Sequence, residues 1–174
     1  MNKFKKITYD NFEKIDELLN DNVKETKRIH TLDYEYGLNE AMIDCESPIE
    51  QLLAMEFERI GLIDMNKFNP FVDVLEIENQ SNIVCNGKRY RVDFAIHVWY
   101  KNQGGKTFII ECDGYEFHQK TKEQVDRDNK RTRSLQKKGY EVIRFSGTEI
   151  YHMTHKCALE VINIILSKCE YKRG

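Results

Sequence analysis

The stretch that most constrains the fold runs from Thr107 to His118 and reads TFIIECDGYEFH. Its apolar run, Phe108 to Ile110, is bounded by glycines on both sides, which is typical of a short strand buried on both faces. Glu111 and Asp113 follow this run, and because side chains alternate along a strand, both leave the sheet on the same face. Two carboxylates this close repel each other unless a cation or a proton lies between them. Oxygen ligands of this kind suit Mg²⁺, although a strand that ends in a polar Asp-Gly turn would explain the same residues.

A further carboxylate is predicted on the neighbouring strand. Residues 88–100, KRYRVDFAIHVWY, follow an Asn86-Gly87 hairpin signal and alternate apolar with polar side chains. Asp93 lies on the polar side of this alternation, where strand propensity alone disfavours a carboxylate. A hairpin of the two strands would bring Asp93, Glu111 and Asp113 to one point.

The order of several motifs resembles a known family. Asp93 is followed by Glu111-x-Asp113-Gly114, then by His118, by Asp128-x-x-Arg131, and by Leu135-x-x-x-Gly139-Tyr140-x-Val142-x-Arg144-Phe145. Over about residues 46–166 this order resembles the PD-(D/E)XK nuclease superfamily, in the branch of the very-short-patch repair endonucleases and their uncharacterised relatives. The resemblance implies an α/β, restriction-endonuclease-like αβββαβα core, with a mixed sheet flanked by helices. The superfamily's usual Glu-x-Lys reads Glu111-Cys112-Asp113 here, so the usual lysine is missing from its place, as it commonly is in this branch.

Length and composition indicate one domain with an extension. The 174 residues suit a single packed core, and we expect an N-terminal helical extension over residues 1–45, with an amphipathic helix over residues 8–30, before a nuclease-like domain over residues 46–174. No apolar run approaches membrane length and no Gly-rich phosphate loop follows a strand, so we expect neither a membrane span nor a nucleotide cofactor. The chain does not start like a secretory signal, and five cysteines without regular spacing fit reduced thiols, so we expect a cytoplasmic protein.

Charge is unevenly distributed along the chain. Residues 1–60 hold 8 basic and 14 acidic side chains, whereas residues 120–138 hold 8 basic and 3 acidic ones. The second segment predicts a polar helix over residues 122–138 that contacts DNA phosphates, the alternative being a solvated helix with internal ion pairs. The side chains expected to contact nucleic acid are Lys120, Lys122, Arg127, Lys130 and Arg133.

We expect one face of that helix to point toward the carboxylates. Gln124, Asp128, Arg131 and Leu135 recur at helical spacing and therefore share a face. Burying Asp128 beside Arg131 is explained most simply by a structural ion pair.

The remaining elements follow from caps and periodicity. Ser47-Pro48-Ile49-Glu50 predicts a helix start in which Glu50 completes a capping box, and the resemblance implies in addition that Glu50 reaches the metal site. Residues 31–45 read as an irregular connection. The other predicted elements are strands over residues 71–78, 83–85 and 140–145, and a closing amphipathic helix over residues 156–166.

These features together predict a Mg²⁺-dependent DNA endonuclease, with Mn²⁺ as a substitute ion. The expected metal ligands are Asp93, Glu111 and either Asp113 or the main-chain carbonyl of Cys112. In place of the lysine, His118 is the first candidate to orient or deprotonate the attacking water, followed by Gln124 or Arg131. The full set of expected catalytic residues is Glu50, Asp93, Glu111, Asp113, His118, Gln124 and Arg131.

Other functions remain open at this stage. The fold could serve as a non-catalytic module for nucleic-acid binding or protein assembly, and a salt pair filling the site would support that alternative. The sequence does not separate DNA from RNA as the substrate, and a homodimer is left open. His152, His155 and Cys157 invite a structural zinc site but lack paired Cys-x-x-Cys spacing, and no histidine can be placed beside Cys112 to make it a nucleophile.

Overall fold

The computed structural model describes residues 37–67, 69–114 and 121–169. Its elements, in chain order, are α3 (Pro48–Arg59), the 3-10 helix η1 (Leu62–Lys67), β1 (Val72–Cys85), β2 (Lys88–Tyr100), β3 (Gly104–Asp113), α4 (Lys122–Lys137), β4 (Glu141–Ser146) and α5 (Gly147–Ser167). The predicted αβββαβα order and the α/β class with a mixed sheet flanked by helices are therefore confirmed. The helix predicted over residues 8–30 lies outside the described residues.

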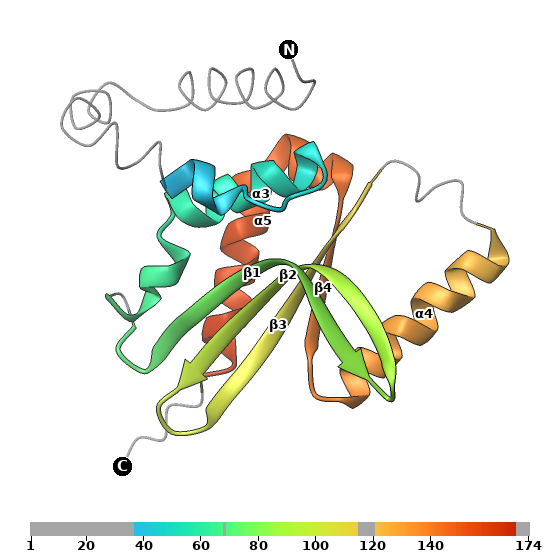
Figure 1. Ribbon diagram of the computed structural model, residues 1–174. Helices are drawn as coiled ribbons and strands as arrows, with labels where there is room; N and C mark the ends of the chain where they lie inside the picture. The colour runs from blue at the N-terminus through green and yellow to red at the C-terminus, as the bar shows by residue number, and fades with distance from the viewer. Residues whose placement is uncertain (1–36, 68, 115–120, 170–174) are drawn as a thin grey trace.

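The four strands form one mixed sheet in the order β1-β2-β3-β4. The first three strands run antiparallel to their neighbours, whereas β4 pairs parallel with β3 after the crossover through α4. α3 and α5 lie together on one face of the sheet and α4 lies on the other (Figure 1). β3 is thus covered on both sides, as its apolar run predicts: Phe108, Ile109 and Ile110 have no exposed surface.

The larger core lies between the sheet and the α3–α5 layer. Phe57 of α3 meets Phe94 of β2 edge to face, with ring centroids 5.7 Å apart. The Tyr100 hydroxyl donates a hydrogen bond of 2.7 Å to the Ile165 carbonyl and so ties β2 to α5. These contacts join β2, the strand that pairs with β3, to the helices of this layer.

A smaller core lies between the sheet and the C-terminal half of α4. Leu135 is the one buried residue of α4 among those described, and it packs with Val92, Ala95 and Ile109. The N-terminal half of α4 carries exposed side chains, including Val125 at 41% exposure. α4 is therefore anchored by its last turns, while its first turns project beside the sheet (Figure 1).

Two elements differ from the sequence prediction in their extent. β1 is one strand over Val72–Cys85, not two separate strands, because its polar middle pairs with β2 as well; the register of this pairing shifts between Val74 and Glu76. α5 begins nine residues before the predicted start, at Gly147, because Ser146 and Glu149 form a capping box that the sequence analysis did not use. A kink at Met153, whose φ and ψ are −140° and 36°, interrupts the periodicity of α5.

Residues 37–41 are helical, where the sequence analysis predicts an irregular connection. Leu38 and Met42 pack against Met55 of α3, and the Asn79 amide donates hydrogen bonds to the carbonyls of Ala41 and Ile43. This segment is therefore fixed to both α3 and β1.

Within the described ranges, no helix combines the length and the apolar character that a membrane span needs.

Candidate active site

Asp93 and Glu111 meet at the junction of β2 and β3. Phe94 pairs with Ile110, so Asp93 and Glu111, the next residues outward on their strands, share the face opposite to that pair. Asp93 is partly buried and Glu111 is 5% exposed. The hairpin thus brings these two predicted site residues together, while the roles assigned to them stay predictions.

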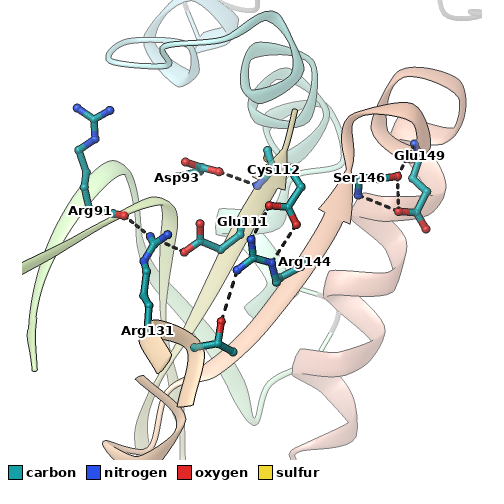
Figure 2. Close-up of polar contacts among 10 residues, drawn as sticks. Arg91, Asp93, Glu111, Cys112, Arg131, Arg144, Ser146 and Glu149 are labelled. Atoms are coloured by element: carbon teal, nitrogen blue, oxygen red, sulfur yellow. Dashed lines mark hydrogen bonds and ion pairs between the residues drawn. The ribbon is translucent and has the colours of Figure 1, made fainter. Parts of the chain in front are cut away.

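Asp93 is fixed by the main chain of β3. Its Oδ2 accepts a hydrogen bond of 2.6 Å from the backbone N–H of Cys112 (Figure 2). Among the described residues, no hydrogen bond reaches its other oxygen, Oδ1.

Glu111 is fixed by α4. Arg131 donates from Nη2 to Glu111 Oε1 at 2.8 Å, and the same nitrogen also donates to the Arg91 carbonyl of β2 (Figure 2). Arg131 therefore links α4 to both strands of the hairpin. Glu111 Oε2, like Asp93 Oδ1, receives no hydrogen bond from the described part of the chain.

Asp113 has a different environment. Arg144 donates to both of its oxygens, from Nε to Oδ2 at 2.9 Å and from Nη2 to Oδ1 at 2.5 Å. Arg144 Nη1 also lies 3.4 Å from the Thr132 hydroxyl of α4. The parallel register of β3 and β4 places Arg144 beside Glu111, so its side chain extends along the sheet to reach Asp113.

Glu50 lies at the start of α3 and is 6% exposed. It accepts three hydrogen bonds: from the Ser47 hydroxyl at 2.6 Å, the Glu46 N–H at 2.9 Å and the Gln80 amide at 2.6 Å. The cap at Ser47 is present as predicted. Glu50 is also among the charges that raise the pKa of Asp93, so it lies within electrostatic range of the hairpin carboxylates.

The Gln80 backbone is in the left-handed region, with φ of 50°, in the interior of β1. This conformation costs free energy for a residue other than glycine, and such strain concentrates at functional sites.

Burial and crowding of like charges perturb the titration of this face. Burial raises the pKa of Glu111 to about 7, opposed by Arg131 and reinforced by Asp93. Burial also raises the pKa of Asp93 above its ordinary value, partly offset by the hydrogen bond from Cys112. The hydrogen bonds to Asp113 raise the pKa of Arg144, which is charged at any working pH. Protons therefore compete with any cation for Glu111 near neutral pH.

The predicted basic residues of α4 are exposed. Lys122, Arg127, Lys130 and Arg133 all project to solvent along the helix. Gln124 is exposed as well and closes the capping box with Thr121, accepting from the Thr121 N–H at 2.7 Å. The structure thus gives Gln124 a local role at the helix start. Two predicted residues, His118 and Lys120, lie outside the described residues.

The cysteines and the C-terminal histidines do not assemble a further site. All five cysteines are free, and burial raises the pKa of Cys45 to about 12 and that of Cys112 further still, so neither thiol forms a thiolate nucleophile readily. His155 contacts Glu56 at 2.7 Å. In the described part of the chain, no three His, Cys, Asp or Glu side chains converge on one metal position.

Two residues of this region, Arg144 and Gln80, were not predicted from the sequence to belong to the site. Arg144 appears in the motif run but was given no role, and its place beside Glu111 depends on the long-range pairing of β3 with β4. Gln80 carries no signal except its position in a polar interruption of β1.

A family model described as REase_MTES_1575, a family of restriction-endonuclease-like domains, matches residues 75–165, just over half of the chain. No curated protein and no solved structure matches the chain.

Proposed function

Because the chain belongs to the restriction-endonuclease-like family REase_MTES_1575, we propose that it is a Mg²⁺-dependent endonuclease that hydrolyses phosphodiester bonds of DNA. The observation that carries this proposal is the pair Asp93 and Glu111. One oxygen of each carboxylate accepts a hydrogen bond, and the other oxygen has no hydrogen-bond donor among the described residues. The finer placement beside the very-short-patch repair endonucleases, and a cytoplasmic location, stay predictions.

The donor set fits a hard divalent ion. Mg²⁺ is bound in many proteins by one or two carboxylates together with water and substrate phosphate, so two carboxylates suffice without a third protein side chain. Asp93 and Glu111 would hold the ion, joined by the main-chain carbonyl of Cys112. When bound, the ion polarises the scissile phosphate and lowers the pKa of a coordinated water. Mn²⁺ should substitute for Mg²⁺, because it accepts the same oxygen ligands.

The protein's own residues supply orientation and binding. Arg131 fixes the rotamer of Glu111 and joins it to β2, so the two carboxylates keep their spacing when α4 contacts a ligand. The exposed cations of α4 contact the phosphate backbone on either side of the cleaved bond. His118 remains the candidate base, since the histidine side chain titrates near neutral pH.

The reaction is a hydrolysis with a simple balance of atoms. The water oxygen forms a new bond to phosphorus, and the bond from phosphorus to one sugar oxygen breaks with its electron pair. A base takes one proton from the water, and the departing oxygen gains a proton. No oxidant, nucleotide or other co-reactant takes part.

The direct test is incubation with supercoiled plasmid in Mg²⁺, Mn²⁺ or EDTA. Nicked or linear DNA should appear only with a divalent ion, and Asp93→Asn or Glu111→Gln should abolish it while the circular dichroism spectrum is unchanged. The matched control is Glu141→Gln, which removes a partly exposed carboxylate of β4 that pairs with Lys168, and this variant should cleave normally. Metal-independent cleavage, or full activity of both site variants, would refute the proposal.

A second function is a non-catalytic nuclease fold that binds nucleic acid or another protein. The observation that favours it is that Glu111 and Asp113 each form an ion pair with an arginine. A protein of this kind would bind DNA in EDTA as tightly as in Mg²⁺ and leave the plasmid intact. RNA as the substrate is tested in the same assay with a labelled RNA of the same sequence.

A further inference from the structure

The three carboxylates of this sheet face do not have equivalent environments. Asp93 and Glu111 each accept a hydrogen bond through one oxygen, whereas Asp113 accepts a donor from Arg144 on each of its two oxygens. A metal ion bound by Asp113 would compete with a bidentate guanidinium contact for both oxygens, and such contacts are among the strongest hydrogen-bonded pairs that proteins form. At Asp93 and Glu111 it would meet an oxygen that no described residue occupies.

Arg144 is held in place from both sides. The backbone of Arg144 belongs to β4 and pairs with Glu111 of β3. Asp113 accepts hydrogen bonds from Nε and Nη2 of the guanidinium, and the Thr132 hydroxyl of α4 lies 3.4 Å from Nη1. The Arg144 side chain is 26% exposed, so the guanidinium is fixed without being sealed from solvent. A guanidinium has five N–H donors, and among the described residues Asp113 accepts from two of them and the Thr132 hydroxyl from a third.

We propose that Asp113 is not a metal ligand but a positioning residue for Arg144, and that Arg144 is the fixed cation that stabilises negative charge on the cleaved phosphate. This inference rests on the proposed function. Asp113 lies two positions after Glu111, where a cationic side chain would face the site directly. Its ion pair with Arg144 places a cation there from β4 instead. The planar fork of arginine matches the oxygens of a phosphate, and cations already in position when charge develops contribute strongly to catalysis.

The alternative is that the pair only joins β3 to β4. Metal affinity shows whether Asp113 is a ligand, because a positioning role lowers kcat and leaves metal binding intact. Rescue of an Arg144 variant by guanidinium shows whether the pair does more than join the strands. The test compares Asp113→Asn with Asp93→Asn, with Mn²⁺ binding measured by titration calorimetry on the metal alone and plasmid cleavage measured separately.

Asp113→Asn should bind Mn²⁺ as the wild type does, while its kcat falls by about 10²–10³-fold, the loss typical when one electrostatic stabiliser is removed. Asp93→Asn should lose Mn²⁺ affinity by more than about tenfold, since even residues outside the ligand set change affinity that much. Arg144→Ala should keep Mn²⁺ affinity, and added guanidinium ion should restore part of its activity. An ion pair that only joins two strands would not show this rescue.

The chain offers a matched control in Arg59. It makes the same two-bond contact with the carboxylate of Glu56, at 2.8 and 2.6 Å, but lies more than two turns along α3 from Glu50. Arg59→Ala should lower the melting temperature and leave kcat unchanged, with no effect of guanidinium.

The outcomes identify which idea is wrong. If Asp113→Asn loses Mn²⁺ affinity as Asp93→Asn does, Asp113 is a ligand and the inference is refuted while the nuclease function stands. If guanidinium restores no activity to a folded Arg144→Ala protein, Arg144 does not act as a catalytic cation. If the wild type neither binds Mn²⁺ nor cleaves, the proposed function itself fails, and the inference fails with it.

Discussion

Glu111→Gln should stabilise the metal-free protein at alkaline pH. Burial raises the pKa of Glu111 from 4.5 to about 7, so the folded chain disfavours the ionised carboxylate more than the unfolded chain does. For a raised pKa, stability is greatest below the unfolded value and is lost as the pH rises through the folded value. Glutamine has the shape of the protonated carboxylic acid and can still accept the hydrogen bond from Arg131, so it avoids this loss.

The magnitude follows from the shift. A difference of about 2.5 pKa units corresponds to about 3 kcal/mol, which is fully expressed at about pH 8 and falls below about 1 kcal/mol at about pH 5. The conversion is appropriate because the Glu111 side chain is only 7% exposed. For a chain of this size, the melting temperature of the variant should exceed that of the wild type by roughly 6–12 °C at about pH 8.

The assay is thermal unfolding in EDTA at both pH values, followed by circular dichroism. Glu141→Gln is the control, because the Glu141–Lys168 pair is partly exposed and such pairs contribute less than about 1 kcal/mol at either pH. Added Mg²⁺ should then stabilise the wild type and not the Glu111 variant, since a ligand stabilises only the protein that binds it. A variant that is less stable than the wild type at about pH 8 would show that the ion pair with Arg131 outweighs burial, and would refute the reasoning.

Three further changes test separate parts of the molecule. Lys130→Gln with Arg133→Gln should weaken DNA binding and flatten its salt dependence by about one unit of slope per lost phosphate contact, and an unchanged slope would place the DNA on another surface. His118→Ala should lower kcat by about 10²–10⁴-fold with DNA affinity unchanged, and a normal rate would exclude this residue from proton transfer. Gln80→Gly should relieve the strain at φ of 50° but also remove a hydrogen-bond donor from the buried Glu50 carboxylate, so we expect lower activity and no gain in stability. Asn86→Gly, at φ of 52° in the β-hairpin turn, removes no such donor and should keep normal activity, so equal activity of the two glycine variants would contradict a role for the Gln80 amide.

The sequence predicted the elements that local patterns determine. The apolar run of β3, the Asn86-Gly87 turn and the cap at Ser47 are each encoded by a few adjacent residues, and each is present. The continuity of β1 is different, because its polar middle has no strand signal and is held by pairing with β2, from Asn79 with Phe94 to Asn82 with Arg91. The early start of α5 was missed for another reason: its first turns carry exposed apolar side chains and a kink, which disturb the periodicity that identifies a helix.

The site shows the same division between local and long-range information. Alternation within β2 and β3 was enough to place Asp93 and Glu111 on one face. No local pattern states which cation meets which carboxylate. The contacts of Arg131 with Glu111 and of Arg144 with Asp113 depend on where α4 and β4 pack, so helical spacing, which suggested an Asp128–Arg131 pair, did not predict that Arg131 contacts Glu111.

The charges around Asp93 favour the proposed divalent ion. Glu111 and Asp113 each pair with an arginine, whereas the hydrogen-bond donors that the described residues offer to Asp93 and Glu50 are all neutral. When both are ionised, Asp93 and Glu50 repel each other, and Glu50 accordingly contributes to the raised pKa of Asp93. A phosphodiester, itself an anion, would be repelled by such a surface even with the basic α4 nearby. One divalent cation would balance these two negative charges, so that the phosphate could approach.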